Sequence, residues 1–149
     1  MNQTLIKLWI TMQATLTLRD GIFQRVAIAP LDHLGNWILL EDFTYHIGYK
    51  GSPDIITVPA GFVFNGMSIP RIFWWFAHPM ESDTIIASLV HDHCFYTRVY
   101  SLSKSDQIFH DALLACKVNK IKAAILYLGL RAWSWYVWNK NLHGPEKEI

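Results

Sequence analysis

The spacing of apolar residues changes in the middle of the chain. Residues 15 to 60 contain short runs of β-branched and aromatic residues separated by turn-forming residues. These runs predict strands at Leu16–Leu18, Phe23–Ile28, Trp37–Leu40, Phe43–Ile47 and Ile55–Val58. Short strands at such close spacing are typical of a small antiparallel sheet or meander.

From Ser82 onward the apolar residues recur at helical spacing. Ser82 is a suitable N-cap, and the stripe that follows it is Ile86, Leu89, Val90 and Cys94. A second helix is predicted to begin at Ser103, and a third, capped by Asn119, is predicted to run to about Trp138. The chain is therefore predicted to be α+β, with a small antiparallel sheet followed by three helices.

Between the two halves lies a segment rich in glycine and proline, from Val58 to Pro70. Its composition predicts an irregular loop rather than a helix or strand. The Asn65-Gly66 dipeptide indicates a tight turn, because both residues tolerate positive φ. Two interpretations stay open: a corner that joins sheet to helices, or a loop that places backbone carbonyls or amides at a site.

The length of 149 residues is that of one domain. Neither an internal repeat nor a low-complexity linker divides it. We predict a single α+β domain over residues 1–149 with one shared core. It is mainly β over residues 1–60, contains a Gly/Pro-containing and aromatic connection over 61–81, and is helical over 82–140.

Composition excludes two classes of protein. A hydrophobic fraction of 52% with 17% charged residues excludes global disorder. Thirteen Lys and Arg against twelve Asp and Glu leave a net charge of +1, and no basic run stands out, so nucleic acid is not an expected partner. The two cysteines, Cys94 and Cys116, favour buried thiols in a reducing compartment over a disulfide or a reactive thiol.

Neither secretion nor membrane insertion is predicted. The N-terminal residues lack the charged region, apolar core and cleavage site of a signal peptide. The most apolar stretch, Ala123 to Trp138, carries Arg131 and is shorter than the roughly 20 residues that a bilayer requires, so no transmembrane segment is expected.

The residues that suggest chemistry are grouped around His91-Asp92 in the first predicted helix. Asp106 follows fifteen positions after His91 and approaches it if the two helices pack antiparallel. A carboxylate behind a histidine fixes its tautomer and raises its basicity, as a general base acting through water requires. Neighbouring helical positions point about 100° apart, so His91 and Asp92 are not expected to bond each other. Asp92, with backbone carbonyls from a glycine-containing loop, suits calcium.

Structural interpretations of the same residues stay open. A single helical histidine is often a packed core residue. Asp106 follows Ser103 by three positions, which is the spacing of a capping box. His110-Asp111 repeats the dipeptide, which shows how easily it arises. The aromatic residues of the last helix are expected to be mainly core, with a surplus available as a partner surface or interfacial anchor: Trp133, Trp135, Tyr136 and Trp138.

Five motifs share one order and spacing with a known family: Val58-Pro59-Ala60-Gly61-Phe62, Ser68-Ile69-Pro70, Phe73-Trp74-Trp75, Val90-His91-Asp92 and Asp106-Gln107-Ile108-Phe109. Through them residues 56 to 138 resemble a phage and prophage family of unknown function, domain-of-unknown-function family 1353. The resemblance implies a viral or prophage origin and no activity. Two positions depart from the pattern, with Asn65 in place of Asp and Phe95 in place of Tyr.

A shorter motif, His91-Asp92-x-Cys94-Phe95 followed by Asp106, is similar to the helix pair of phospholipase A2-like enzymes. That resemblance implies His91 as the base for water, Asp106 as its orienting carboxylate and Asp92 as a calcium ligand. The only candidate for the calcium loop is the segment that contains Gly61, Asn65 and Gly66, and its sequence does not match the enzyme loop.

Three functions follow as expectations. The first is a phage-encoded accessory protein without proven catalysis, either a virion or assembly component or a factor that binds a host or defence protein, located in the host cytoplasm or the virion. The alternative is a calcium-dependent, phospholipase A2-like ester hydrolase that uses His91, Asp92 and Asp106. The second alternative is a binder of nucleotides or other small molecules. A protein partner is expected, and contact with a membrane surface stays open.

Overall fold

The structure is a computed structural model that describes residues 15–16, 26–32, 36–65 and 82–140. The chain divides into two compact units, residues 1–65 and residues 66–149. The first unit contains the strands and the second the three helices. Each unit is described below by itself.

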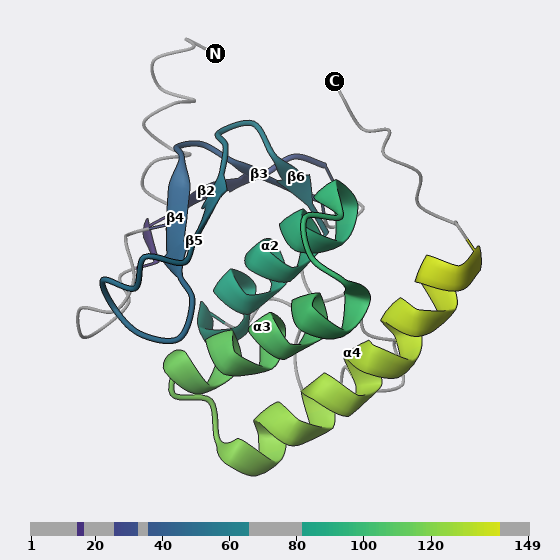
Figure 1. Cartoon of the computed structure of the whole chain (residues 1–149). Helices are drawn as coiled ribbons and strands as arrows, with labels where there is room; N and C mark the ends of the chain where they lie inside the picture. Colours follow the sequence, from purple (N-terminus) through teal and green to yellow (C-terminus); the bar gives the residue numbers. More distant parts are fainter. Residues whose placement is uncertain (1–14, 17–25, 33–35, 66–81, 141–149) are drawn as a thin grey trace, which may run out of the picture. The chain divides into compact units, whose positions relative to one another are not determined.

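The first unit holds two antiparallel sheets (Figure 1). The four-stranded sheet has the order β1-β2-β3-β6, and its strands are β1 (Thr15–Leu16), β2 (Val26–Pro30), β3 (Trp37–Leu39) and β6 (Val63–Phe64). The second sheet is a pair, β4 (Phe43–His46) with β5 (Ile55–Val58).

Alternation of apolar and polar residues explains the β4–β5 pair. Phe43 and Tyr45 on β4 are buried, and the register places them opposite Val58 and Ile56 of β5, which are buried too. Side chains of a strand point alternately to opposite faces, so these four residues form one apolar face.

The strand predictions hold with small differences in their ends. The prediction for Ile55–Val58 is confirmed, while Trp37–Leu40 and Phe43–Ile47 are each one residue shorter in the structure. The predictions for Leu16–Leu18 and Phe23–Ile28 fall partly on residues outside the described ranges.

The segment predicted as an irregular loop contains a strand, so that prediction was wrong for Val63–Phe64. These two residues form β6, which pairs with Trp37 and Ile38 of β3. Gly61, at a φ of +86°, turns the chain back so that its amide donates to the Leu39 carbonyl at 2.7 Å. Glycine suits this turn because it lacks the Cβ that disfavours positive φ.

The described part of the second unit, residues 82–140, holds three helices: α2 (Ser82–Thr97), α3 (Leu102–Ala115) and α4 (Lys120–Lys140). Helix α3 packs against both α2 and α4 (Figure 1). The residues with the largest apolar side chains in this packing are fully buried: Ile86, Leu89, Ile108, Phe109, Leu113 and Leu126. The predicted fold class, a small antiparallel sheet followed by three helices, is confirmed, whereas one core shared by both halves stays a prediction.

Two of the predicted helix starts agree with the structure and one does not. Helix α2 begins at Ser82, and the Asn119 side chain caps α4 by accepting from the amide of Ile121 at 2.9 Å. Helix α3 is capped by Ser101, whose hydroxyl accepts from the amide of Lys104 at 3.3 Å. The predicted start at Ser103, with a capping box, was therefore wrong. Asp106, the carboxylate considered for that box, instead contacts His91.

The described helices also bear on the membrane and cysteine predictions. Within the described ranges, no helix is both long and apolar enough to cross a bilayer. Cys94 is buried, Cys116 is partly exposed, and neither forms a disulfide bond. Burial raises the pKa of Cys94 to about 12, so this thiol stays protonated and unreactive at neutral pH.

Candidate functional site

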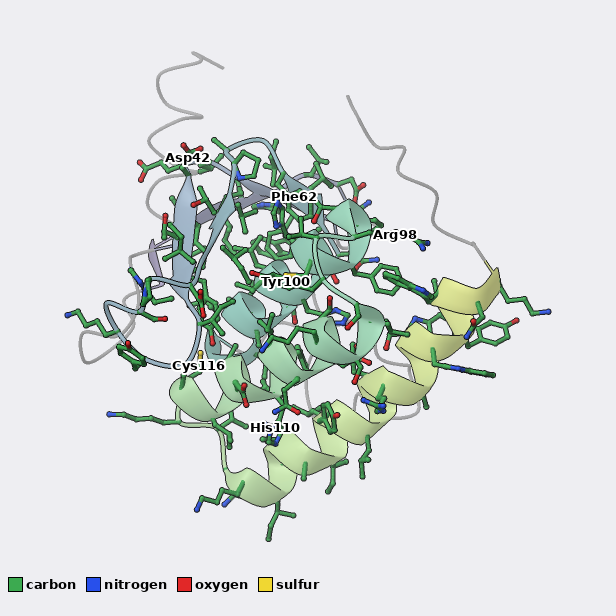
Figure 2. The ribbon with its side chains drawn as sticks, viewed as in Figure 1. Asp42, Phe62, Arg98, Tyr100, His110 and Cys116 are labelled. Carbon is green, nitrogen blue, oxygen red and sulfur yellow. The ribbon has the colours of Figure 1, made fainter. Side chains whose placement is uncertain are left out.

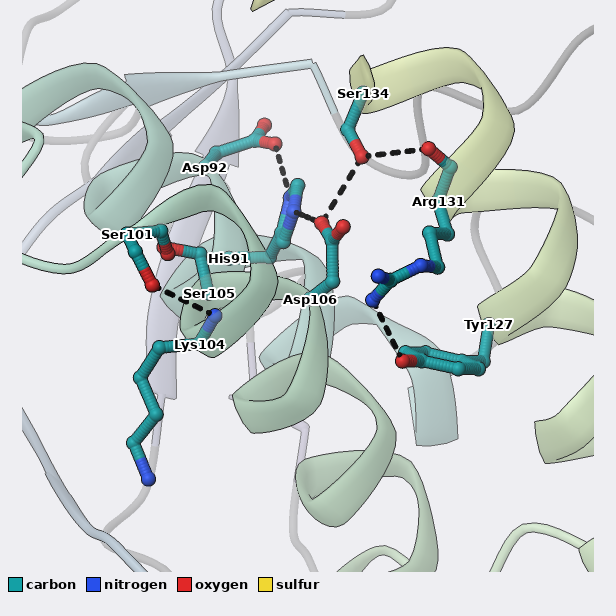
Figure 3. Close-up of polar contacts among 9 residues, drawn as sticks. All are labelled: His91, Asp92, Ser101, Lys104, Ser105, Asp106, Tyr127, Arg131 and Ser134. Atoms are coloured by element: carbon teal, nitrogen blue, oxygen red, sulfur yellow. Dashed lines mark hydrogen bonds and ion pairs between the residues drawn. The ribbon is translucent and has the colours of Figure 1, made fainter.

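A buried histidine and a buried carboxylate meet between α2 and α3. The Nε2 atom of His91 lies 3.0 Å from Oδ1 of Asp106, a distance typical of a hydrogen bond (Figure 3). Only 4% of His91 and 1% of Asp106 is exposed. The approach of these two residues, expected from the helix spacing, is thus present in the structure.

Helix α4 contributes a second polar partner, Ser134, to the Asp106 carboxylate. The Ser134 hydroxyl lies 3.0 Å from Asp106 Oδ1, to which it donates, and 3.3 Å from the Arg131 carbonyl oxygen (Figure 3). Ser134 was not predicted as a site residue. The signal was available, because Ser134 is the polar member of an otherwise apolar helical stripe, Ala123, Leu126, Leu130, Ser134 and Val137.

Asp92 lies on the other side of the imidazole ring. Its Oδ1 is 3.7 Å from Nδ1 of His91, which is within ion-pair range but longer than a hydrogen bond. The expectation that the two neighbours stay apart was therefore only partly right. The 100° between their Cα–Cβ directions fixes where the side chains start, while rotation about χ1 and χ2 brings their polar ends together.

The two carboxylates decide the charge of His91. Burial acts to lower its pKa and is the largest single influence, but the hydrogen bond to Asp106, the contact with Asp92 and both negative charges together raise the pKa above 6.5. The two carboxylates therefore stabilise the imidazolium form by more than burial destabilises it. In the neutral form, Nε2–H donates to Asp106, which leaves the lone pair on Nδ1.

A cavity of about 30 Å³ adjoins this group. Its polar lining is His91, Asp92, Tyr96 and Ser134, and its apolar lining is Phe95, Leu130, Trp133 and Val137. This volume exceeds the roughly 10–15 Å³ that one buried water requires. The cavity lies entirely between residues of the helical unit and combines an imidazole with an apolar wall.

Phe95 and Tyr96 both line the cavity but differ in their other contacts. The Phe95 ring packs on His91 with 5.9 Å between ring centroids, and Phe109 contacts the same imidazole edge-on at 5.6 Å. Tyr96, one position later, lines the cavity. Burial, with the charge of Asp92 adding to it, raises the pKa of Tyr96 to about 12, so its hydroxyl stays a neutral hydrogen-bond donor.

The residues predicted to bind calcium fall in different parts of the chain. Asp92 belongs to the helical unit, Gly61 and Asn65 belong to the unit of residues 1–65, and Gly66 lies outside the described ranges. Among the described residues, no group of three or more His, Cys, Asp or Glu side chains could hold a metal ion. Calcium takes about six to eight oxygen ligands, and its binding to this chain stays a prediction.

The aromatic residues of α4 differ in their exposure. Trp133, Trp135 and Tyr136 are 39%, 63% and 45% exposed. Trp138 is half-buried, packs edge-on against Phe95 at 5.2 Å and carries the Arg98 guanidinium 4.0 Å above its ring. Arg98, labelled in Figure 2, thereby connects the end of α2 to α4. Trp138 therefore has a packing role, whereas the other three are accessible to a partner.

Comparison with known protein families places the chain in one of them. Residues 37–130, more than half of the chain, match the model of the family described as "Protein of unknown function (DUF1353)". The chain belongs to this family. The DUF1353 match includes His91, Asp92 and Asp106 and ends before Ser134. Neither the curated proteins nor the solved structures gave a match. The family description names no activity, so phage origin and the phospholipase resemblance stay predictions.

Proposed function

We propose that the helical unit hydrolyses an ester bond and that His91 is the base that activates water. The observation that carries the proposal is the 3.0 Å contact between His91 Nε2 and Asp106 Oδ1. It orients the ring of a histidine that also lines a cavity with room for at least one water.

The chemistry assigned to these residues begins with water. Nδ1 of His91 accepts a proton from the water, and the hydroxide oxygen forms a bond to the ester carbonyl carbon. The tetrahedral intermediate then breaks its bond to the alcohol oxygen, which leaves with the proton from Nδ1. The products are a carboxylic acid and an alcohol. Asp106 stabilises the imidazolium that exists between the two proton transfers.

The other cavity residues take supporting roles in this proposal. Asp92, 3.7 Å from Nδ1, adds to the stabilisation of the protonated ring. The neutral Tyr96 hydroxyl is the donor that we assign to the oxyanion of the intermediate. Ser134 holds the Asp106 carboxylate in place by its hydrogen bond. No step is assigned to a metal ion.

The apolar part of the cavity favours an ester with an apolar acyl group. Because the cavity is far smaller than the roughly 300–1,000 Å³ of pockets that enclose a ligand, the acyl group must lie along its rim. Trp133 lines the cavity and is also 39% exposed, so its ring provides an apolar surface at that rim. Apolar rims of this kind bind alkyl chains better than small polar substrates.

A series of p-nitrophenyl esters of increasing acyl length tests the proposal. We expect hydrolysis by the wild-type chain to rise with acyl length. His91→Gln should lower kcat by about 10²- to 10⁴-fold, the usual contribution of a general base. The matched control is His110→Gln, which changes a partly exposed histidine next to an aspartate on α3. Equal activity of the two variants, with both shown to be folded by circular dichroism, would contradict the proposal.

The other expected functions stay predictions. An accessory protein without catalysis and a binder of nucleotides or small molecules are both compatible with a chain that hydrolyses none of these esters. Melting shifts with nucleotides, and a pull-down from host lysate or virions, would separate those two.

A further inference from the structure

Helix α4 has apolar residues on two opposite faces. One face is the buried stripe that packs in the helical unit. Residues on the opposite face follow at steps of four, three and seven positions, which keeps them on one side of a helix. They are the exposed residues Ile121, Ile125, Leu128 and Trp135, at 72%, 37%, 63% and 63% exposure. We call these four residues the outer stripe.

The charges on α4 all have one sign. Its charged residues are Lys120, Lys122, Arg131 and Lys140, and its sequence contains neither Asp nor Glu. The total net charge is only +1, so the rest of the chain is net negative, with nine Lys and Arg against twelve Asp and Glu. Helical spacing places Lys122 and Lys140 on one flank of the outer stripe and Lys120 and Arg131 on the other. An apolar stripe with basic residues on both flanks complements a surface that has an apolar interior and a negatively charged outer layer.

We propose that the outer stripe docks on the surface of an anionic lipid bilayer, with α4 lying in the plane of the interface. Basic residues along an apolar helical face are the usual pattern of such helices. Trp135 and Tyr136 on this side are amphipathic aromatics, which favour the headgroup region. Because the opposite face of α4 is buried among the helices, α4 lies on the membrane rather than crossing it.

The charges also argue against a second copy of this chain as the occupant. Pairing two outer stripes would bring basic flanks together without any acidic residue of α4 to compensate them. Anionic lipid headgroups, in contrast, neutralise the flanks, and long Lys and Arg side chains reach the headgroups while their stems stay in apolar surroundings.

Flotation of the full chain with lipid vesicles tests the proposal. Vesicles of phosphatidylcholine alone are compared with vesicles of equal parts phosphatidylcholine and phosphatidylglycerol, at low and at high salt. We expect binding to the anionic vesicles that weakens with salt. Trp135→Glu should lower the partition coefficient at least about tenfold, because it replaces a large apolar contact with an anion.

A control and a second variant make the result specific. Tyr49→Glu changes an aromatic residue that is 65% exposed in the other unit and should leave binding unchanged. The double variant Lys120→Gln with Lys140→Gln should reduce binding to the anionic vesicles only. If Trp135→Glu alters the melting temperature, Leu128→Ser replaces it as the test.

Three results would overturn the proposal: no binding of the wild-type chain to anionic vesicles, equal binding by the α4 variants and the Tyr49 control, or a dimer that Trp135→Glu dissociates in the absence of lipid. The last result would assign the outer stripe to a second copy. Lipid docking does not depend on ester hydrolysis, so a chain that hydrolyses no ester is expected to bind the vesicles all the same.

Discussion

The chain contains the His-Asp dipeptide twice in helices, and the two copies have the same local geometry. His91 and Asp92 on α2 lie 3.7 Å apart, and His110 and Asp111 on α3 lie 3.8 Å apart, each measured from Nδ1 to Oδ1. Their surroundings differ. The side chains of the first pair are 5% and 9% exposed, against 25% and 42% for the second pair.

The two histidines also differ in the contacts that their rings make beyond the neighbouring aspartate. His91 Nε2 contacts the buried Asp106 carboxylate. His110, labelled in Figure 2, instead packs its ring on Tyr127 at 5.1 Å, while Asp111 accepts a hydrogen bond from Gln107 within α3. The dipeptide alone therefore does not make a site. The site arises from burial and from a second carboxylate that the next helix supplies.

Removing the second carboxylate should have the largest effect on stability. Asp106→Ala leaves a buried imidazole without its main partner, and we expect a loss of about 3–5 kcal/mol in the free energy of unfolding. Asp111→Ala removes a partly exposed carboxylate and should change it by about 0.5 kcal/mol or less. Urea denaturation measures both. Similar losses in the two variants would show that the two dipeptides are equivalent.

The hydroxyl that supports Asp106 should have a smaller effect. Ser134→Ala removes a hydrogen bond to a buried carboxylate, which is worth about 1.5–3 kcal/mol. Ser88→Ala is the matched control, because Ser88 is also buried but donates only to the Thr84 carbonyl within its own helix. We expect a smaller loss for Ser88→Ala in the same denaturation experiment. If Ser88→Ala lowers the free energy of unfolding more than Ser134→Ala does, Ser134 has no special role at the Asp106 carboxylate.

The dependence of stability on pH should be the smallest of these effects. The pKa of His91 is raised in the folded chain, so its contribution to stability is complete below 6.5 and is lost as the pH rises through the folded value. The destabilisation caused by His91→Gln should therefore be larger at about pH 5.5 than at about pH 9. Denaturation at the two pH values checks this. A larger destabilisation at high pH would mean that burial outweighs the carboxylates.

The parts of the site that could be predicted are those fixed by local rules. Helical spacing and the short connection between α2 and α3 were enough to bring His91 to Asp106. The apolar stripe of α4 indicates that Ser134 is buried, but its contact with Asp106 depends on how α4 packs, which no local pattern specifies. β6 was missed for the same reason, since two residues become a strand only by pairing with β3. The cap of α3 was misplaced because Ser101 and Ser103 are equally suitable by residue type, and the geometry selects Ser101.

The tautomer and the pKa of the His91 ring test most directly whether His91 is a base that Asp106 orients. Two-bond ¹H–¹⁵N correlation spectra identify which ring nitrogen carries the proton in the neutral form. We predict a proton retained on Nε2, facing Asp106, and titration of Nδ1 at a pKa above 6.5. In Asp106→Asn this pKa should fall, because one of the two carboxylates is removed. A neutral ring protonated on Nδ1, or a pKa that Asp106→Asn leaves unchanged, would contradict the assignment of His91 as a base oriented by Asp106.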